Sequence, residues 1–291
     1  MIHLPLQSTL SIRTIASLDI AAASGITVRD DRLYVVADDE LVLPVYTLAG
    51  ERVGSIPLVS GSLPDDPVAR KAAKPDFEAL LSLPNSDLLV LGSGSTSRRE
   101  RGAWVRFSAG EATVEPIDLS ELYRSLRSAL PELNIEGGVI MDGSLWLCSR
   151  GDGARRDNAL IRLDYARVAE RMSRDRALPA DAVQEVIRVA LPEIDSTPLS
   201  LTDLAVVHDT LVFTAAAEAT TSAYDDGECK GSIVGTLTRG GVAERMELCT
   251  LRLKLEGLCA QASEGAIKLW LVSDADDPAA HAPLMQIDWA P

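Results

Sequence analysis

Short apolar runs, each preceded by a polar turn, recur five times along this chain. The runs are rich in Leu, Val and aromatic residues and read LYVVA, LLVLG, LWLCS, LVFTA and LWLVS. The turns before them carry residues typical of tight hairpins, as at Asp30-Asp31, Asp142-Gly143 and His208-Asp209. Nearly continuous apolarity over such a short run is typical of a strand buried on both faces. The pattern therefore predicts five hairpins whose second strands lie in the core.

The unit that contains each hairpin repeats with a nearly constant period. Aligned on Ser24, Glu78, Glu136, Asp203 and Glu256, successive units are offset by 54, 58, 67 and 53 residues. A self-similar unit of this length, built from strands, indicates a β-propeller. Two more polar, alternating strands follow each hairpin, so one unit provides a blade of four strands.

The strand count predicts how the ring closes. The fifth unit has only one further strand, Leu284–Trp289, and the N-terminal run Ile2–Ile12 belongs to no unit. We predict that this N-terminal strand pairs with the outer edge of the last blade, since closure protects the sheet edges. Residues 1–291 then form a single all-β domain, a propeller of five four-stranded blades, with six blades as the alternative.

Two segments break the strand pattern and favour short helical insertions. Residues 119–130 carry Leu122 and Leu126 on one helical face, and residues 165–177 are rich in helix-forming residues. We expect both insertions to lie over one face of the ring. The long polar stretch at residues 60–75 is expected to be a loop.

Composition narrows the classes of partner. The chain has 28 basic and 43 acidic side chains, which argues against nucleic acid because affinity for phosphates depends on Lys and Arg. No stretch approaches the ~18 uninterrupted apolar residues of a membrane span, and the N-terminus lacks the pattern of a signal peptide. The four cysteines are scattered without a CxxC pair. We therefore expect a cytoplasmic protein that binds neither nucleic acid nor membrane.

An acidic residue opens four of the five units, and this recurrence is the main functional signal. Because the inner strands of a propeller line its channel, Glu78, Glu136, Asp203 and Glu256 are expected to converge there. Carboxylates so close together repel unless a cation, a proton or water intervenes, and their oxygens suit Ca²⁺ or Mg²⁺. The alternative is that each carboxylate accepts backbone N–H bonds and stabilises its own turn.

A second set of polar residues follows the hairpins or lies in nearby loops. Arg150, a cation among carboxylates, can anchor an anionic group or pair with a neighbour. The loop GSGSTSRRER at residues 92–101 is basic but lacks the spacing of a phosphate-binding loop. We expect a small polar or anionic ligand. Its predicted contacts are Lys74, Ser95, Arg101, Arg150, Glu218 and Asp274.

The phrases DFEALLSL, NIEGGVIMDGSLWLCSRG and KLEGL with LWLVSDADD resemble those of uncharacterised bacterial β-propellers near the phytase-like esterases. More distantly, they are similar to the gluconolactonase and regucalcin propellers. The likeness spans about residues 73–289. In the lactonase group, the Glu of a Glu-Gly-Pro motif ligates a divalent metal. Glu136 and Glu256 stand before glycine here, but neither glycine is followed by proline. Phytase-like propellers use calcium to bind phosphates.

Two functions from different classes follow from these features. The first is a propeller whose acidic axial pocket binds a divalent cation and a small ligand and hydrolyses an ester, lactone or phosphoester. The second is a non-catalytic ligand-binding or scaffold propeller whose carboxylates are structural. A metal-free glycosidase that uses two of the carboxylates is a third reading. The sequence indicates no particular protein partner.

Overall fold

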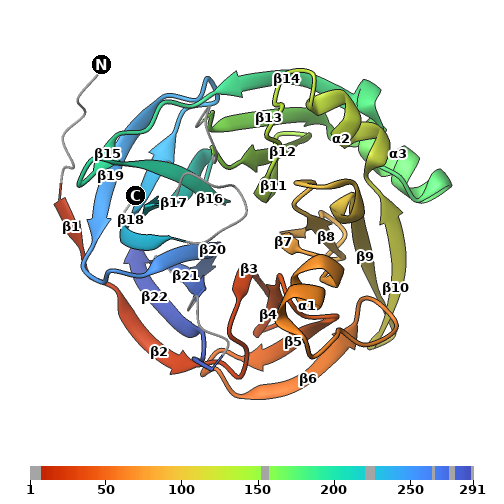
Figure 1. Ribbon diagram of the computed structural model, residues 1–291, viewed down its shortest axis with the longest axis horizontal. Helices are drawn as coiled ribbons and strands as arrows, with labels where there is room; N and C mark the ends of the chain where they lie inside the picture. The colour runs from red at the N-terminus through yellow and green to blue at the C-terminus, as the bar shows by residue number, and fades with distance from the viewer. Residues whose placement is uncertain (1–7, 152–156, 220–226, 264–265, 275–278, 290–291) are drawn as a thin grey trace.

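Antiparallel four-stranded sheets are arranged as five blades around a central channel (Figure 1). The computed structural model describes residues 8–151, 157–219, 227–263, 266–274 and 279–289. From the channel outwards, blade one contains β3 (Ala23–Arg29), β4 (Arg32–Ala37), β5 (Val42–Thr47) and β6 (Arg52–Pro57). Blade two contains β7 (Phe77–Ser82), β8 (Leu88–Gly92), β9 (Arg101–Ser108) and β10 (Glu111–Asp118). Blade three contains β11 (Ile135–Met141), β12 (Ser144–Ser149), β13 (Ala159–Asp164) and β14 (Val183–Arg188).

The last two blades complete the ring and confirm five blades rather than six. Their strands, again from the channel outwards, are β16 (Thr197–Val207), β17 (Thr210–Ala219), β18 (Glu228–Leu237) and β19 (Ala243–Cys249), then β20 (Lys254–Ser263), β21 (Ala266–Asp274), β22 (Pro283–Trp289) and β2 (Arg13–Ser17). Two short strands, β1 (Ser8–Leu10) and β15 (Glu193–Ile194), extend the sheet of blade four.

An N-terminal strand closes the ring, as predicted, but it is not the predicted segment. β2 pairs antiparallel with β22, so residues 13–17 complete the last blade. Within the predicted segment Ile2–Ile12, β1 instead runs parallel to β19 and covers the outer edge of blade four. The chain therefore crosses from one blade to the next before it closes the ring. Each of the two strands covers a sheet edge that would otherwise be exposed.

Hairpin turns join the inner two strands of blades one to four through residues in the left-handed region. Asp30 and Asp31 have φ values of 49° and 54°, and Asp142 has 50° before a glycine at 72°. Asp and Gly tolerate this conformation, which matches the twist of the flanking strands. The corresponding turn of blade five lies outside the described residues.

Both predicted helical insertions are present, and a third helix was missed. α2 (Ser120–Leu126) lies over blades two and three, whereas α3 (Tyr165–Asp175) lies at the rim (Figure 1). α1 (Pro67–Ala73) lies in the segment 60–75 that was expected to be a loop. Its signal was present but short: the Asp66 side chain caps the helix and Pro67 occupies its first turn.

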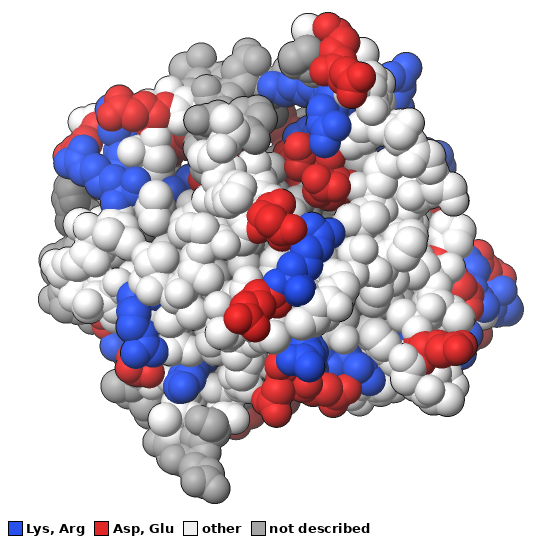
Figure 2. Space-filling model, turned by 90° about the horizontal axis from the view of Figure 1, so that it is seen from below, with Lys and Arg blue, Asp and Glu red and all other residues white. Residues whose placement is uncertain are grey.

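Many acidic side chains on the surface lie next to basic ones and form ion pairs with them. On the face shown in Figure 2, Lys and Arg side chains lie next to Asp and Glu in small groups separated by uncharged surface. Arg52 pairs with Asp19 in this manner at 2.8 Å. Exposed pairs of this kind each contribute little to stability, about 0–1 kcal/mol.

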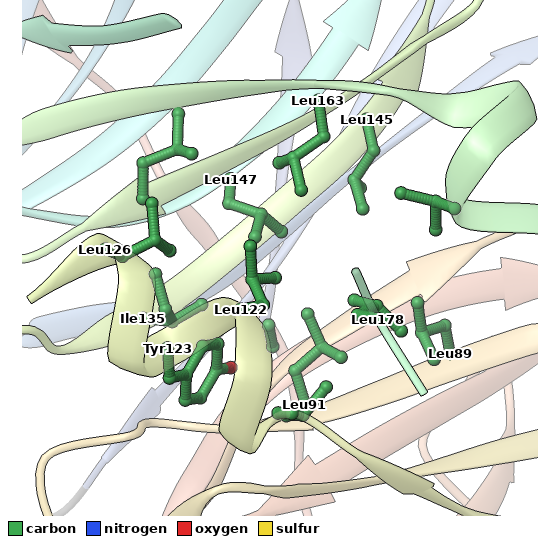
Figure 3. Packing of buried hydrophobic residues seen from close by; sticks show 14 of the residues in the cluster. Leu89, Leu91, Leu122, Tyr123, Leu126, Ile135, Leu145, Leu147, Leu163 and Leu178 are labelled. Carbon is green, nitrogen blue, oxygen red and sulfur yellow. The ribbon is translucent and has the colours of Figure 1, made fainter. Parts of the chain in front are cut away.

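The core lies between neighbouring blades. Between blades two and three, Leu91 of β8, Leu147 of β12 and Leu122 of α2 meet in one apolar cluster (Figure 3). α2 belongs to this core because Leu122 and Leu126 are buried, as the predicted face requires. Tyr123 in the same turn donates a hydrogen bond from its hydroxyl to the carbonyl of Gly92 at 2.7 Å. Helix α2 therefore anchors the end of an inner strand pair.

Candidate functional site

The inner strand of every blade contains a β-bulge at the same end of the channel. The residues skipped in the pairing with the second strand are Ser24, Glu78, Glu136, Thr202 and, with its following glycine, Glu256. A bulge leaves its extra residue out of the ladder and redirects its side chain. The equivalent residue of blade four is thus Thr202. Asp203, which was used to align the repeats in the sequence, is the next residue along the chain.

Asp203 lies beside the bulge and binds backbone groups of two blades. Its Oδ1 accepts a hydrogen bond from the N–H of Leu204, and its Oδ2 accepts one from the N–H of Leu258, both at 2.7 Å. A Cβ atom on Gly137 would lie 2.0 Å from Asp203 Oδ1, so glycine is needed where blade three approaches this carboxylate. Burial raises the pKa of Asp203 despite these hydrogen bonds. The carboxylate therefore joins neighbouring blades at the channel.

Three carboxylates from blades one and two form a compact group, here called the acidic trio: Asp38, Asp76 and Glu78. Asp38 follows β4, whereas Asp76 and Glu78 lie on either side of the first residue of β7. One oxygen from each lies within 4.8 Å of the others. Like charges at this separation repel strongly unless cations or protons compensate them.

Two cationic side chains compensate part of this charge. Lys74, the C-cap of α1, places its Nζ against Asp38 and 3.3 Å from Asp76 Oδ1. Arg99 Nη1 lies 2.7 Å from Asp76 Oδ2, which also accepts a hydrogen bond from the Ser93 hydroxyl at 2.5 Å. Among the described residues, no hydrogen bond or ion pair reaches the carboxylate of Glu78. The trio is therefore bound on its Asp76 side and open at Glu78.

A second group, centred on Arg150, joins blades three, four and five. The guanidinium of Arg150 lies 2.5 Å from Glu218, 3.3 Å from Glu256 and 3.6 Å from Glu136. Lys254 adds a second cation, 3.1 Å from Glu256 and 3.6 Å from Glu218. All five residues are at most 8% exposed. Arg150 thus pairs with carboxylates of three blades, which is one of the two roles that its position among acids suggested.

Together, the two groups hold an excess of negative charge. They contain six carboxylates against four cations, Lys74, Arg99, Arg150 and Lys254, so two negative charges remain if all are ionised. Burial, opposed by Lys74 and reinforced by Asp76, raises the pKa of Asp38 to about 6. Burial and the neighbouring acids raise the pKa of Glu78, and burial raises that of Glu256. This end of the channel therefore favours a proton or a bound cation.

The remaining predicted ligand contacts lie in three different places. Ser95 accepts a hydrogen bond from Arg99 at 2.8 Å, at the margin of the acidic trio. Asp274 ends β21 and pairs in register with Lys254 of the Arg150-centred group. Arg101 is exposed and lines a different cavity, at the outer strand of blade two. The structure thus brings Lys74 and Ser95 to one group, and Arg150 and Glu218 to the other.

Asp76 and Lys254 were not recognised from the sequence as site residues. Asp38 and Arg99 stood out only as charged residues near the hairpins and in the basic loop, without a role as a metal or ligand contact. Asp76 had a usable signal, because it is a second acid only two residues before Glu78. Lys254 likewise stands two residues before Glu256. A search for charged pairs two residues apart at each unit start would have found both.

Below the bulges, the channel widens into a cavity of about 310 Å³. Its wall consists of three successive residues from each of the five inner strands, beginning at Ile26, Leu80, Gly138, Leu204 and Leu258. These lining residues are mainly apolar and none of them is charged, whereas the two charged groups lie at the bulge end. The channel is polar at that end and largely apolar beyond it.

Comparison with known proteins places the chain in a family. Residues 19–288 match the model described as "Family of unknown function (DUF6929)". The chain belongs to this family. No curated protein sequence matches it. The family therefore confirms the expectation of an uncharacterised group without adding an activity.

Solved structures show the same fold at low sequence identity. An exo-1,5-α-L-arabinanase from a bovine ruminal metagenomic library is 12% identical, with a TM-score of 0.51 over 98% of this chain and 99% of that one. Regucalcin, a calcium-binding protein from Agrobacterium tumefaciens, is 11% identical, with a TM-score of 0.51 over 97% and 96%. The likeness to regucalcin agrees with the predicted resemblance at the level of the fold. Neither the family match nor these two structures support the likeness to phytase-like esterases.

Proposed function

We propose that the acidic end of the channel binds a divalent cation, Ca²⁺ or Mg²⁺, together with a small polar or anionic ligand. The observation that carries this proposal is the acidic trio, whose three oxygens lie within 4.8 Å of one another, while no hydrogen bond or ion pair among the described residues engages the carboxylate of Glu78. Ligand oxygens around Ca²⁺ lie about 2.3–2.6 Å from the ion, so oxygens of one shell are separated by up to about 5 Å. The donor set, all carboxylate oxygen, suits a hard cation.

The proposed ligands of the cation differ from those expected from the sequence. Glu78 remains, but Asp38 and Asp76 replace Glu136, Asp203 and Glu256. Asp203 is engaged with backbone N–H groups, and the other two acids are paired with Arg150. Those three residues fit the alternative reading of structural carboxylates.

The small ligand is proposed to bind beside the cation. Ser95 and Lys74 border the trio, and Arg150 with Glu218 lies across the channel end as a second set of polar contacts. A cation held by the trio would supply a Lewis acid for hydrolysis of an ester, lactone or phosphoester. The protein's own residues would orient the ligand through the Ser95 hydroxyl and the Lys74 ammonium.

Thermal unfolding with and without divalent cations tests the cation site. After EDTA treatment, added Ca²⁺ or Mg²⁺ should raise Tm, since a ligand at a hundred times its Kd stabilises the native state by about 2.7 kcal/mol. Glu78→Gln should abolish the rise, whereas Glu185→Gln, an exposed residue in blade three, should not. If neither cation changes the Tm of the wild type, the non-catalytic scaffold is the better description. Hydrolytic activity that survives EDTA would favour a two-carboxylate reaction without metal.

Lys74 provides a second, sharper test, because its ammonium contacts two members of the trio. In the absence of metal it acts as the counter-ion of Asp38 and Asp76. A bound cation must compete with it, so Lys74→Met should bind Ca²⁺ more tightly in calorimetric titrations. Lys71→Met, at the last turn of α1, removes the same charge close by and serves as the control. Weaker binding by Lys74→Met would mean that Lys74 positions the carboxylates rather than competing for them.

A further inference from the structure

Blade two carries a second cavity, of about 420 Å³, at its outer strand. Its walls come from the 3-10 helix η1 (Ser97–Arg99), the start of β9, the end of β10 and the C-cap of α3. Three arginines from two distant parts of the chain line it: Arg98, Arg101 and Arg176. Pro116 and Ile117 provide its apolar wall. None of these residues belongs to the acidic trio or to the Arg150-centred group.

The arginines of the loop 97–101 are divided between the channel and this cavity. Arg99 is 8% exposed and is directed inward to Asp76. Arg98 and Arg101 are exposed on the other side. Arg98 donates one hydrogen bond, to the carbonyl of Ala72 at 3.4 Å, and Arg101 donates one from its Nε to the carbonyl of Arg98 at 2.9 Å. Neither guanidinium forms an ion pair with any carboxylate in the part of the chain that the structure describes.

Two carboxylates, Glu100 and Asp118, line the same cavity, and one of them is ion-paired. Glu100 lies 2.5 Å from Arg127. Asp118 accepts a hydrogen bond from the N–H of Ser120 at 2.9 Å. The third arginine, Arg176, is fixed by an ion pair with Glu115 at the α3 C-cap. Arg98 and Arg101 therefore line this cavity as two neighbouring guanidiniums that form no ion pair among the described residues.

We propose that this cavity binds a small organic anion, whose carboxylate or phosphate group lies between Arg98 and Arg101. Guanidinium groups bind both oxyanions through paired N–H donors, so the two sources share one chemistry. The apolar part of the ligand would pack on Pro116, Ile117 and the methylene stems of the arginines. The cavity volume lies within the range of small-molecule sites, about 300–1,000 Å³. This site is separate from the proposed cation site and does not depend on it.

Titrations followed by NMR of the arginine Nε–H signals test the proposal. The probes are phenyl phosphate, benzoate, inorganic phosphate and neutral phenol, each added to the intact protein. Phenyl phosphate or benzoate should shift the signals of Arg98 and Arg101 and bind more tightly than phenol. Inorganic phosphate should bind more weakly than phenyl phosphate, because it lacks the apolar part. Phenol binding as tightly as phenyl phosphate would overturn the anion site, and so would an absence of binding by both organic anions at millimolar concentration.

Variants locate the binding. Arg98→Gln combined with Arg101→Gln should weaken binding of phenyl phosphate by about tenfold or more, since charge-assisted hydrogen bonds are lost. Arg124→Gln removes a nearby charge on α2 that does not line the cavity and should leave the affinity within about twofold of wild type. Both side chains of the double variant are exposed, so its Tm should stay unchanged. Equal affinity in the double variant and the wild type would refute the assignment.

Discussion

Replacement of Arg150 by methionine is the most direct test of how the channel end is held together. Methionine keeps an unbranched apolar side chain but removes the charge and the N–H donors. Arg150 lies within 3.6 Å of Glu136, Glu218 and Glu256, and its side chain is 6% exposed. After the change, these acids of three blades retain Lys254 as their nearest described cation.

The expected loss follows from the cost of unpaired buried charge. Removal of one partner of a buried ion pair costs about 3–5 kcal/mol, because the remaining charge stays desolvated. Three carboxylates share Arg150, so we expect Arg150→Met to fall at the upper end of that range. The loss should shrink on acidification, since the acids can take up protons and the pKa of Glu256 is already raised.

Urea unfolding at about pH 8 and about pH 5 measures both effects. The control is Arg162→Met, which removes an arginine of the same blade paired with Glu185 at 3.2 Å and substantially exposed. That variant should lose no more than about 1 kcal/mol. Adding Glu218→Gln to Arg150→Met should recover part of the stability. If Arg150→Met is as mild as Arg162→Met, the Arg150-centred group does not stabilise the ring.

Three further predictions concern the ring, the channel and pH. Deleting residues 1–17 should lower Tm much more than deleting residues 1–12, because only the first deletion removes β2 and opens the last blade; equal Tm values for the two deletions, measured by circular dichroism, would contradict this closure. Asp203→Ala should cost about 2–4 kcal/mol in urea unfolding, because it leaves buried backbone N–H groups of two blades without an acceptor. The pKa of Asp38 is raised to about 6 in the folded protein. Protonation of Asp38 therefore stabilises the fold fully when the pH is below the pKa of this group in the unfolded chain, and this stabilisation is lost as the pH rises through about 6. Asp38→Asn should therefore flatten the decline of Tm between about pH 4 and pH 7, and an unchanged slope would exclude this titration.

The architecture was predictable because propeller blades repeat one pattern of burial. Runs such as Leu88–Gly92 are buried on both faces, so they are apolar at every position rather than at alternate ones. Hairpin turns such as Asp30-Asp31 occupy a left-handed conformation that few residue types tolerate. Both signals are local in sequence. They could be read without knowing which blades are neighbours.

Features that depend on pairing between distant segments could not be read in this way. The N-terminal segment contains two short strands, and nothing local tells which of them, β1 or β2, meets β22. In blade four, the bulge falls on Thr202, one residue before the acid used for the alignment. A bulge is a property of the ladder between two strands and leaves no charge in the sequence to mark it.

The same distinction explains why the acidic repeat indicated the end of the channel but not its chemistry. An acid at each unit start predicts convergence, since equivalent positions meet at the axis. Whether such acids bind a cation depends on the counter-charges, and these come from elsewhere: Lys74 from the C-cap of α1, and Arg150 from the end of a second strand. Arg150 pairs directly with acids of blades three to five, whereas Lys74 acts on Glu78 only through its charge and forms no ion pair with it among the described residues. The asymmetry between the two groups, rather than the recurrence of the acids, is therefore what favours a cation at blades one and two.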